Sequence, residues 1–229
     1  MASPKELFQS GNLKDAIQAL GAILRENPAD AKSRTFLFEL LCFTGEYDRA
    51  EKHLNVLASD NGQAEMGAVL YLSAIHAARE RESMFEKHTY PTEEVPPSLK
   101  GTLNGEPFES VVDTDSRLGA RLELFAAGAY LWFPFVHIES IELEAPKRLR
   151  DTLWAPAIVR TGPSFKGQEL GQVLLPVISP QSCKNPDGNI ALGRSTEWVD
   201  SVPVGLKMLD VDGEEFSFLE IRNLEFAVE

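Results

Sequence analysis

The chain has 229 residues, 43% of them hydrophobic and 25% charged, a composition typical of an ordered globular protein with one large or two small domains. Its formal net charge of −13 at pH 7 argues against nucleic acid and anionic membrane surfaces as partners, because both are bound by clustered Lys and Arg. No signal-peptide core or membrane-length segment is present, and the two cysteines are too few for a disulfide framework or a zinc site, so we expect a protein of the reducing cytoplasm without membrane insertion.

The N-terminal part, residues 5 to 87, has a helical pattern with an internal repeat of 34 residues. Gly11 aligns with Gly45, and Ala16 aligns with Ala50. This spacing is the tetratricopeptide period, in which each repeat is a helix, a tight turn and a second helix. Because glycine permits the turn and alanine permits close helix approach, the pattern predicts an α-α helical repeat domain.

The repeat array is short. About two and a half repeats can be counted, because residues 63 to 87 predict one long helix with no second helix after it. Roughly three repeats are normally needed to bury a continuous core. We therefore expect the helical part to depend on the rest of the chain for its stability.

Prolines at positions 91, 96 and 97 predict a linker, because proline disfavours helix and stiffens the chain. We predict a tetratricopeptide-like repeat domain over residues 1–90, a Pro-rich linker over 91–100 and an acidic β-rich domain over 101–229. Residues 1–90 carry 10 Lys and Arg against 13 Asp and Glu, whereas residues 91–229 carry 12 against 22. Most of the net negative charge therefore lies in the second domain.

Residues 122 to 144 give the richest strand signal of the second domain. Charged and apolar residues alternate at its start, Ala127 and Gly128 allow a turn, and an aromatic run of the strand-favouring kind follows. Pro134 can open a single helical turn, and a period of two resumes at Ser140. We predict a hairpin, one helical turn and a further strand.

Turn signals divide the remainder of this domain. Asn104-Gly105 and Asp212-Gly213 are hairpin-turn dipeptides between strand-like runs. Residues 154–160 and 172–177 predict another strand pair, in which Pro156 suggests an edge strand, and residues 179–193 predict a loop. The expected fold class is therefore multi-domain α and β, with an α+β second domain that is mostly antiparallel and barrel-like.

Four motifs carry a further signal through their order and spacing. They are Tyr130-x-Trp132-x-Pro134-Phe135-x-x-Ile138, Arg150-Asp151-x-x-Trp154-Ala155-Pro156, Leu175-Pro176 and Leu192-Gly193-Arg194-x-Thr196-x-Trp198. In this order they resemble the ImpE/TagJ family of bacterial type VI secretion accessory proteins. Together with the N-terminal repeats, the resemblance covers nearly the whole chain.

The resemblance implies a cytoplasmic adaptor associated with the contractile sheath of the secretion system. Some proteins of that family bind the small subunit of the sheath, and they are linked to sheath disassembly by a ClpV-type AAA+ ATPase. The resemblance implies the fold more strongly than the mechanism, and it supplies no set of binding residues.

The residues offer little for catalysis. No G-x-S-x-G, Walker A or G-x-G-x-x-G motif is present, and the four histidines are far apart in sequence. Asp113 and Asp115 are either paired carboxylates or part of a solvated strand face, and we favour the solvated face. Asp212-Gly213 fits a hairpin turn better than a calcium loop, because strands flank it. We therefore expect no enzyme, no cofactor and no metal site.

The motif that ends at Trp198 has two interpretations. A glycine, an arginine and a tryptophan close together are typical of a binding hot spot, so the motif could be a recognition loop. Alternatively, Trp198 packs in the β core and Arg194 forms an internal ion pair with the acidic residues of this domain. We favour the second interpretation.

Two classes of function remain. The first is a non-enzymatic adaptor whose repeat domain holds a segment of a protein partner, and the sequence favours it because a repeat surface is present. The second is a small-molecule-binding protein or hydrolase with a site at the domain junction, formed by Arg194, Asp151 and neighbouring carboxylates. Ligand screening and partner co-purification distinguish these classes.

The repeat period also predicts a partner-binding surface. In tetratricopeptide arrays the first helix of each repeat lines the concave face, where an amphipathic helix can be held by apolar anchors. Phe43 is then either a hot spot or a residue buried beneath the following repeat, and both remain open. The predicted partner-binding residues are Lys32, Thr35, Glu39, Cys42, Phe43, Val69, Ser73 and His76.

Overall fold

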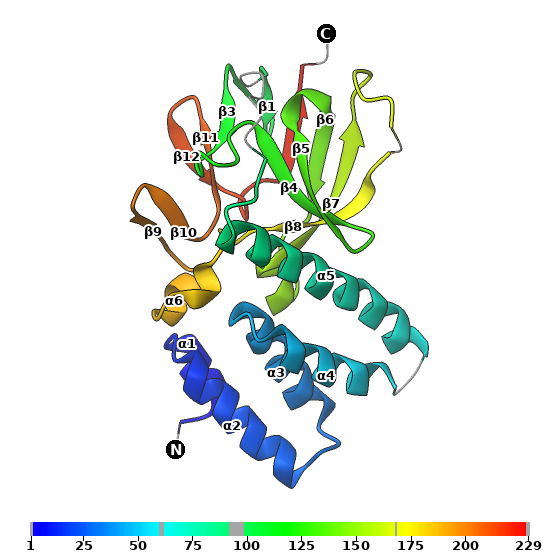
Figure 1. Ribbon diagram of the computed structural model, residues 1–229, viewed down its shortest axis with the longest axis vertical. Coiled ribbons are helices and arrows are strands. Elements are labelled where there is room, and N and C mark those ends of the chain that lie inside the picture. The colour runs from blue at the N-terminus through cyan, green and yellow to red at the C-terminus, as the bar shows by residue number, and fades with distance from the viewer. Residues whose placement is uncertain (1, 60–61, 92–98, 168, 228–229) are drawn as a thin grey trace.

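The computed structural model describes residues 2–59, 62–91, 99–167 and 169–227. Helices gather at one end of the molecule and strands at the other (Figure 1). The N-terminal helices are α1 (Pro4–Gln9), α2 (Leu13–Glu26), α3 (Ala31–Phe43), α4 (Tyr47–Ala58) and α5 (Gly62–Glu86). Among the described residues, no helix is both long enough and apolar enough to cross a membrane.

The helices confirm the predicted tetratricopeptide-like repeats. α1 and α2 form a short first repeat, α3 and α4 form a second, and α5 follows them as the single long helix that the pattern predicted. Gly11 and Gly45 lie in the turns within the two repeats with φ angles of 78° and 70°, which glycine adopts without strain. Ala16 and Ala50 are fully buried, so the helices approach closely at these positions.

The second half is built of antiparallel strands, as predicted. They are β1 (Gly101–Leu103), β2 (Glu106–Phe108), β3 (Val111–Asp113), β4 (Arg121–Ala126), β5 (Ala129–Pro134), β6 (Ile138–Leu143), β7 (Trp154–Thr161), β8 (Gly171–Pro176), β9 (Thr196–Val199), β10 (Val202–Gly205), β11 (Met208–Val211), β12 (Glu214–Ser217) and β13 (Asn223–Phe226). The largest sheet has the order β2-β1-β13-β6-β7-β8-β4-β5. A second sheet has the order β12-β11-β3, and β9 pairs with β10. The large sheet ends at β2 and at β5, so it is not closed into a barrel.

Three hairpin turns occur where the sequence predicted them. In Asn104-Gly105, Ala127-Gly128 and Asp212-Gly213, both residues have positive φ angles. Two consecutive residues of this kind form a type I′ turn, whose twist matches that of the flanking strands.

Short helical turns connect the strands. Pro134 precedes one of them, as predicted, whereas the predicted loop over residues 179–193 contains two. These turns are η1 (Phe135–His137), η2 (Leu149–Thr152), η3 (Ser182–Lys184) and α6 (Gly188–Ala191).

The prediction that Pro156 marks an edge strand was wrong. Pro156 lies in β7, which has β6 on one side and β8 on the other. The pairing with β6 begins only at Ala157, opposite Leu143, so the strand has no β6 neighbour at Pro156. The missing N–H of proline therefore costs no hydrogen bond with β6 there.

Two hydrophobic clusters stabilise the fold. The first includes Leu20 and Phe38 among the helices and continues into the sheet through Trp154 and Leu174. The second lies within the β half, on the other face of the large sheet, and includes Leu122. Because the first cluster spans helices and strands, the helical repeats complete their core with side chains from the second half.

We expect a fragment of residues 1–90 to be helical but to melt at a lower temperature and over a broader range than the whole chain. The fragment loses Trp154 and Leu174 from its core, and an array of so few repeats has weak cooperativity. Thermal melting followed by circular dichroism tests this. A sharp transition of the fragment at the temperature of the whole chain would mean that the repeats fold independently.

Candidate functional site

The concave face of the helical repeats is occupied by the chain itself. Residues 149–154, here called the inserted segment, consist of η2 and the start of β7 and lie against α3 and α5. Nη1 of Arg150 lies 2.8 Å from Oε1 of Glu39, and its guanidinium lies 4.7 Å from the ring centroid of Tyr71. The Trp154 ring stacks on Tyr71 at 6.5 Å between centroids. The motif that runs from Arg150 to Pro156 therefore packs against the repeats of its own chain.

Three of the predicted partner-binding residues are buried in this structure. Glu39, Cys42 and Phe43 have exposed fractions of 7%, 2% and 1%. Burial of the Phe43 ring settles the two alternatives left open for it in favour of the interior. A partner helix cannot contact these three side chains while the inserted segment is in place.

The remaining predicted residues lie in two places. Lys32 is exposed and Thr35 is half-buried in the first half of α3, where the Thr35 hydroxyl donates to the carbonyl of Ala31. Val69, Ser73 and His76 lie along α5 near the β4–β5 turn, and Nδ1 of His76 is 3.1 Å from the carbonyl oxygen of Gly128. The predicted surface is thus divided.

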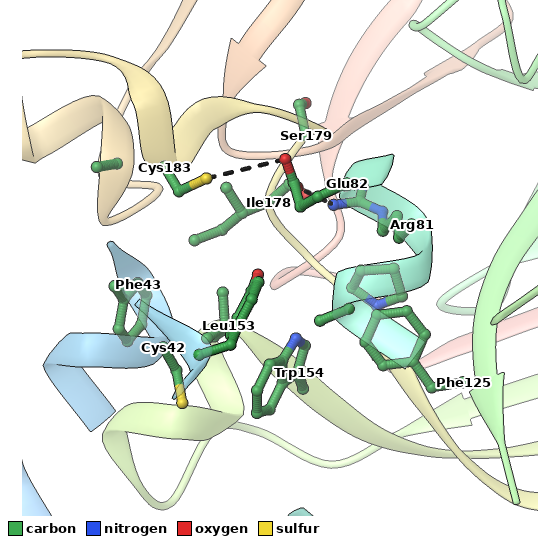
Figure 2. Close-up of a pocket in the computed structure, with 14 residues that line it drawn as sticks. Cys42, Phe43, Arg81, Glu82, Phe125, Leu153, Trp154, Ile178, Ser179 and Cys183 are labelled. Atoms are coloured by element: carbon green, nitrogen blue, oxygen red, sulfur yellow. Dashed lines mark hydrogen bonds and ion pairs between the residues drawn. The ribbon is translucent and has the colours of Figure 1, made fainter. Parts of the chain in front are cut away.

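A small cavity lies beneath the inserted segment (Figure 2). Its volume is about 20 Å³, which holds about one water molecule and no substrate. Figure 2 shows Cys42, Phe43, Leu153 and Trp154 on one side of it and Cys183 on the other. Sγ of Cys183 lies 3.8 Å from Oε2 of Glu82.

Neither thiol of this cavity is activated. Burial, together with the repulsion of a thiolate by Glu82, raises the pKa of Cys183 to about 12. Burial likewise raises the pKa of Cys42 well above its ordinary value. Because the thiolate is the nucleophilic form, these cysteines are packing residues at neutral pH.

Buried ions connect α5 to the β half beside this cavity. Nε and Nη2 of Arg81 donate to the two carboxylate oxygens of Glu123 at 2.8 and 2.9 Å. Lys207 also contacts Glu123, and its Nζ lies 2.9 Å from Oδ2 of Asp113. Tyr130 donates its hydroxyl proton to Glu123. We call Arg81, Glu123, Lys207 and Asp113 the ion cluster.

The prediction that Asp113 and Asp115 lie on a solvated strand face was wrong. Their exposed fractions are 3% and 2%, and Asp115 is paired with Arg117. Asp113 is buried beside Lys207, with which it forms an ion pair. This pairing could not be deduced from the sequence, because Lys207 is more than ninety positions from Asp113.

The pKa values of the two carboxylates of the ion cluster move in opposite directions. Burial alone would raise the pKa of Glu123, but Arg81 and Lys207 outweigh it and hold the pKa well below its ordinary value. Burial raises the pKa of Asp113 to about 6 despite the nearby Lys207. Glu123 is therefore an anion that holds the junction together, with no proton available for acid–base chemistry.

The residues proposed for a junction ligand site have structural partners instead. Oδ2 of Asp151 accepts the backbone N–H groups of Lys147 and Arg148, both at 2.9 Å. Arg194 donates to the carbonyl oxygens of Phe8 and Gln9 at the end of α1, rather than forming the predicted ion pair. These two side chains do not form a common site.

An apolar hollow lies between α5 and the sheet, at the edge of the junction between the helices and the β half. Two adjoining cavities of about 550 and 300 Å³ share four lining residues, Leu70, Phe125, Ala127 and Leu174. We call the combined space the α5–sheet groove. It is the region of the sheet face that α5 leaves uncovered next to its first turns.

The floor of this groove consists of residues that lie opposite one another on neighbouring strands. Phe125, Leu174 and Pro156 are cross-strand neighbours on β4, β8 and β7. A second row of cross-strand neighbours is more polar and crosses β8, β7, β6 and β13; it contains Gln172, Ile158, Glu142 and Asn223. The groove is therefore apolar beside α5 and polar at its far end, where Glu142 is paired with Arg160, Glu144 is paired with Lys147, and Arg222 also lines the wall.

Two of the predicted partner-binding residues, Val69 and Ser73, line the α5–sheet groove. Val69 and Leu70 are 60% and 49% exposed, which is unusual for side chains of this kind. Sequence periodicity identified α5 as a contact helix, but it could not find the sheet residues opposite. No local signal links Phe125, Pro156 and Leu174, because only strand pairing brings them together.

The site and fold can be compared with known proteins. Residues 105–225 match the family profile described as ImpE protein, which is just over half of the chain, and residues 7–70 match the tetratricopeptide repeat. A Pseudomonas aeruginosa protein named type VI secretion system accessory component TagJ is 29% identical over 257 residues, covering 97% of this chain and 90% of that protein.

A crystal structure of a Vibrio parahaemolyticus protein has the same fold. The TM-score is 0.86 at 22% sequence identity, and the match covers 99% of this chain and 98% of the other. The two proteins therefore share the whole arrangement in which the helical repeats pack against the sheet.

Asp113→Asn tests the electrostatics of the ion cluster. Because the folded-state pKa of about 6 exceeds the ordinary value of 3.8, the folded state holds this proton more tightly than the unfolded chain. The resulting stability is present below pH 4 and is lost as the pH rises through 6. We expect the free energy of unfolding of the wild type, relative to Asp113→Asn, to fall by about 2 kcal/mol between pH 4 and pH 7.

Urea unfolding of both proteins across this pH range measures the difference. Other groups titrate in both proteins and cancel in the comparison. Parallel stability curves would mean that Asp113 has an ordinary pKa.

Proposed function

Because this chain belongs to the ImpE family, we propose that it acts as a non-enzymatic accessory adaptor of a bacterial type VI secretion system. The printed name of the Pseudomonas aeruginosa relative supports the accessory role. The tetratricopeptide-like repeats support an adaptor, since such repeats commonly build protein-binding surfaces. The unactivated cysteines and the fully ionised Glu123 favour binding over catalysis.

We propose that the partner is a helical segment of the small subunit of the contractile sheath. The observation that carries this proposal is the α5–sheet groove, which is open and apolar, whereas the concave face of the repeats is filled. Adjoining hollows of about 550 and 300 Å³ are large enough to take several side chains of one helix face.

The groove suits an amphipathic helix in particular. Anchors spaced at i, i+3 and i+4 can fill the hollow between Leu70 and the row formed by Phe125, Leu174 and Pro156. The far end is lined by polar and charged side chains, and Glu142 and Glu144 there are already paired with Arg160 and Lys147, so a polar end of the partner helix is favoured. The polarity of the lining therefore selects both the face and the direction of the helix.

A cytoplasmic location and a link to sheath disassembly by a ClpV-type ATPase complete the proposal. A sheath subunit held by this protein is exposed to the cytoplasm, where such an ATPase acts. Whether the protein meets the ATPase is tested by the same binding experiments with both components present.

Leu70→Arg tests the groove. The arginine places a bulky charge in the apolar part of the groove, and we expect binding of the purified sheath small subunit to weaken by at least ~10-fold. The side chain is half exposed, so the free energy of unfolding should change by less than about 0.5 kcal/mol. Isothermal titration calorimetry and thermal melting measure the two quantities.

Val56→Arg is the matched control, because Val56 is an exposed apolar side chain of α4, with an exposed fraction of 46%, and it does not line the groove. It should bind like the wild type. Wild-type affinity in the folded Leu70→Arg variant would place the partner elsewhere, and no binding by the wild type would exclude the sheath small subunit.

A further inference from the structure

The hairpin formed by β9 and β10 stands at one side of the molecule, between α6 and the β11–β12 hairpin in the view of Figure 1. Its strands pair with each other, from Thr196 opposite Gly205 to Val199 opposite Val202. The two-residue turn, Asp200-Ser201, has φ angles of 50° and 65°, so it is a type I′ turn built without glycine. This turn fixes the hairpin in one shape.

The base of the hairpin is tied firmly to the fold. The backbone N–H of Gly205 donates to the buried hydroxyl of Ser182 at 2.8 Å, and its carbonyl accepts the N–H of Ser179 at 2.8 Å. The hydroxyl of Thr196 donates to the carbonyl of Leu206. The free end is therefore presented on a rigid base, which reduces the entropy lost on binding.

The free end carries the most exposed aromatic ring of the chain. Trp198 is 50% exposed and Val199 is 49% exposed, whereas every other Phe, Tyr and Trp is buried or half-buried. The prediction that Trp198 packs in the β core is wrong. Its cross-strand neighbour Pro203 is buried, so the indole extends the apolar surface outward. A tryptophan on a rigid support is a typical binding hot spot.

Most of the charged residues that follow this ring in sequence are acidic. From Ser195 to Glu220 the sequence holds seven acidic residues and one basic residue, Lys207, whose exposed fraction is 2%. Asp200 follows Val199 in the turn and is exposed. Glu197 is also exposed, but it accepts from the Asn185 amide and lies on the other face of β9 from Trp198. Nearby Arg194 is engaged with the end of α1. An approaching segment therefore meets an apolar ring in a negative field.

We propose that this hairpin tip is a second protein-binding surface, and that it takes a basic segment of a partner in which arginine or lysine alternates with apolar residues. A cationic side chain can stack on the indole of Trp198 while the exposed Asp200 neutralises part of the partner's charge. Val199 supplies contact area for an apolar neighbour. The surface is separate from the α5–sheet groove, so the protein holds two partner segments at once.

The test uses the full-length protein and a dye-labelled synthetic peptide of alternating arginine and leucine, with fluorescence anisotropy as the measurement. We expect saturable binding to the wild type, a loss of at least ~10-fold in affinity for Trp198→Ala, and no binding of the matched glutamate–leucine peptide. Leu70→Arg should bind the arginine peptide like the wild type, which separates this surface from the groove.

Asp200→Asn tests the charge without disturbing the turn, because asparagine tolerates the same positive φ. It should weaken binding a few-fold and reduce its salt dependence. Val56→Ala, on the exposed surface of α4, is the control and should not change the affinity. Equal affinity of the wild type and a folded Trp198→Ala variant, or equal binding of the two peptides, would overturn the proposal, as would no binding by the wild type.

Discussion

The contact on which the arrangement depends is the insertion of residues 149–154 into the concave face of the helical repeats. Two and a half repeats leave an apolar concave surface and one unpaired long helix, α5, which must be covered. Trp154 covers it by stacking on Tyr71, and Arg150 pairs with the buried Glu39. Once this segment is seated, α5 lies across the sheet at a fixed position, and the uncovered part of the sheet face becomes the α5–sheet groove.

The ion cluster gives the same junction its specificity. Apolar contacts alone would allow α5 to slide or rotate on the sheet, whereas Arg81 reaches both oxygens of Glu123 in only one position. Buried ion pairs add little net stability because desolvation offsets the attraction, but an unpaired member costs about 3–5 kcal/mol. Misplaced arrangements are therefore penalised, and the two proposed partner surfaces keep a constant separation.

Local features of the fold were predictable from the sequence, and non-local ones were not. The repeat period located the helix pairs, and dipeptides such as Asn104-Gly105 located the hairpins, because a few neighbouring residues determine these shapes. The position of β7 inside the sheet, the burial of Asp113 and the exposure of Trp198 depend on residues distant in sequence. The candidate groove combines α5 with residues of β4, β6, β7, β8 and β13, so the pattern identified Val69 and Ser73 but none of the residues facing them.

The place of β13 in the large sheet has a consequence for synthesis of the protein. β13 follows every other strand in the chain, yet it pairs with β1 on one side and β6 on the other. While the chain grows on the ribosome, β1 and β6 lack the strand that joins them, and their edges stay open to pairing with other chains. The helical repeats emerge first but wait for Trp154 to complete their core. A fold with contacts this distant in sequence forms slowly, and its large sheet closes only after β13 has been synthesised.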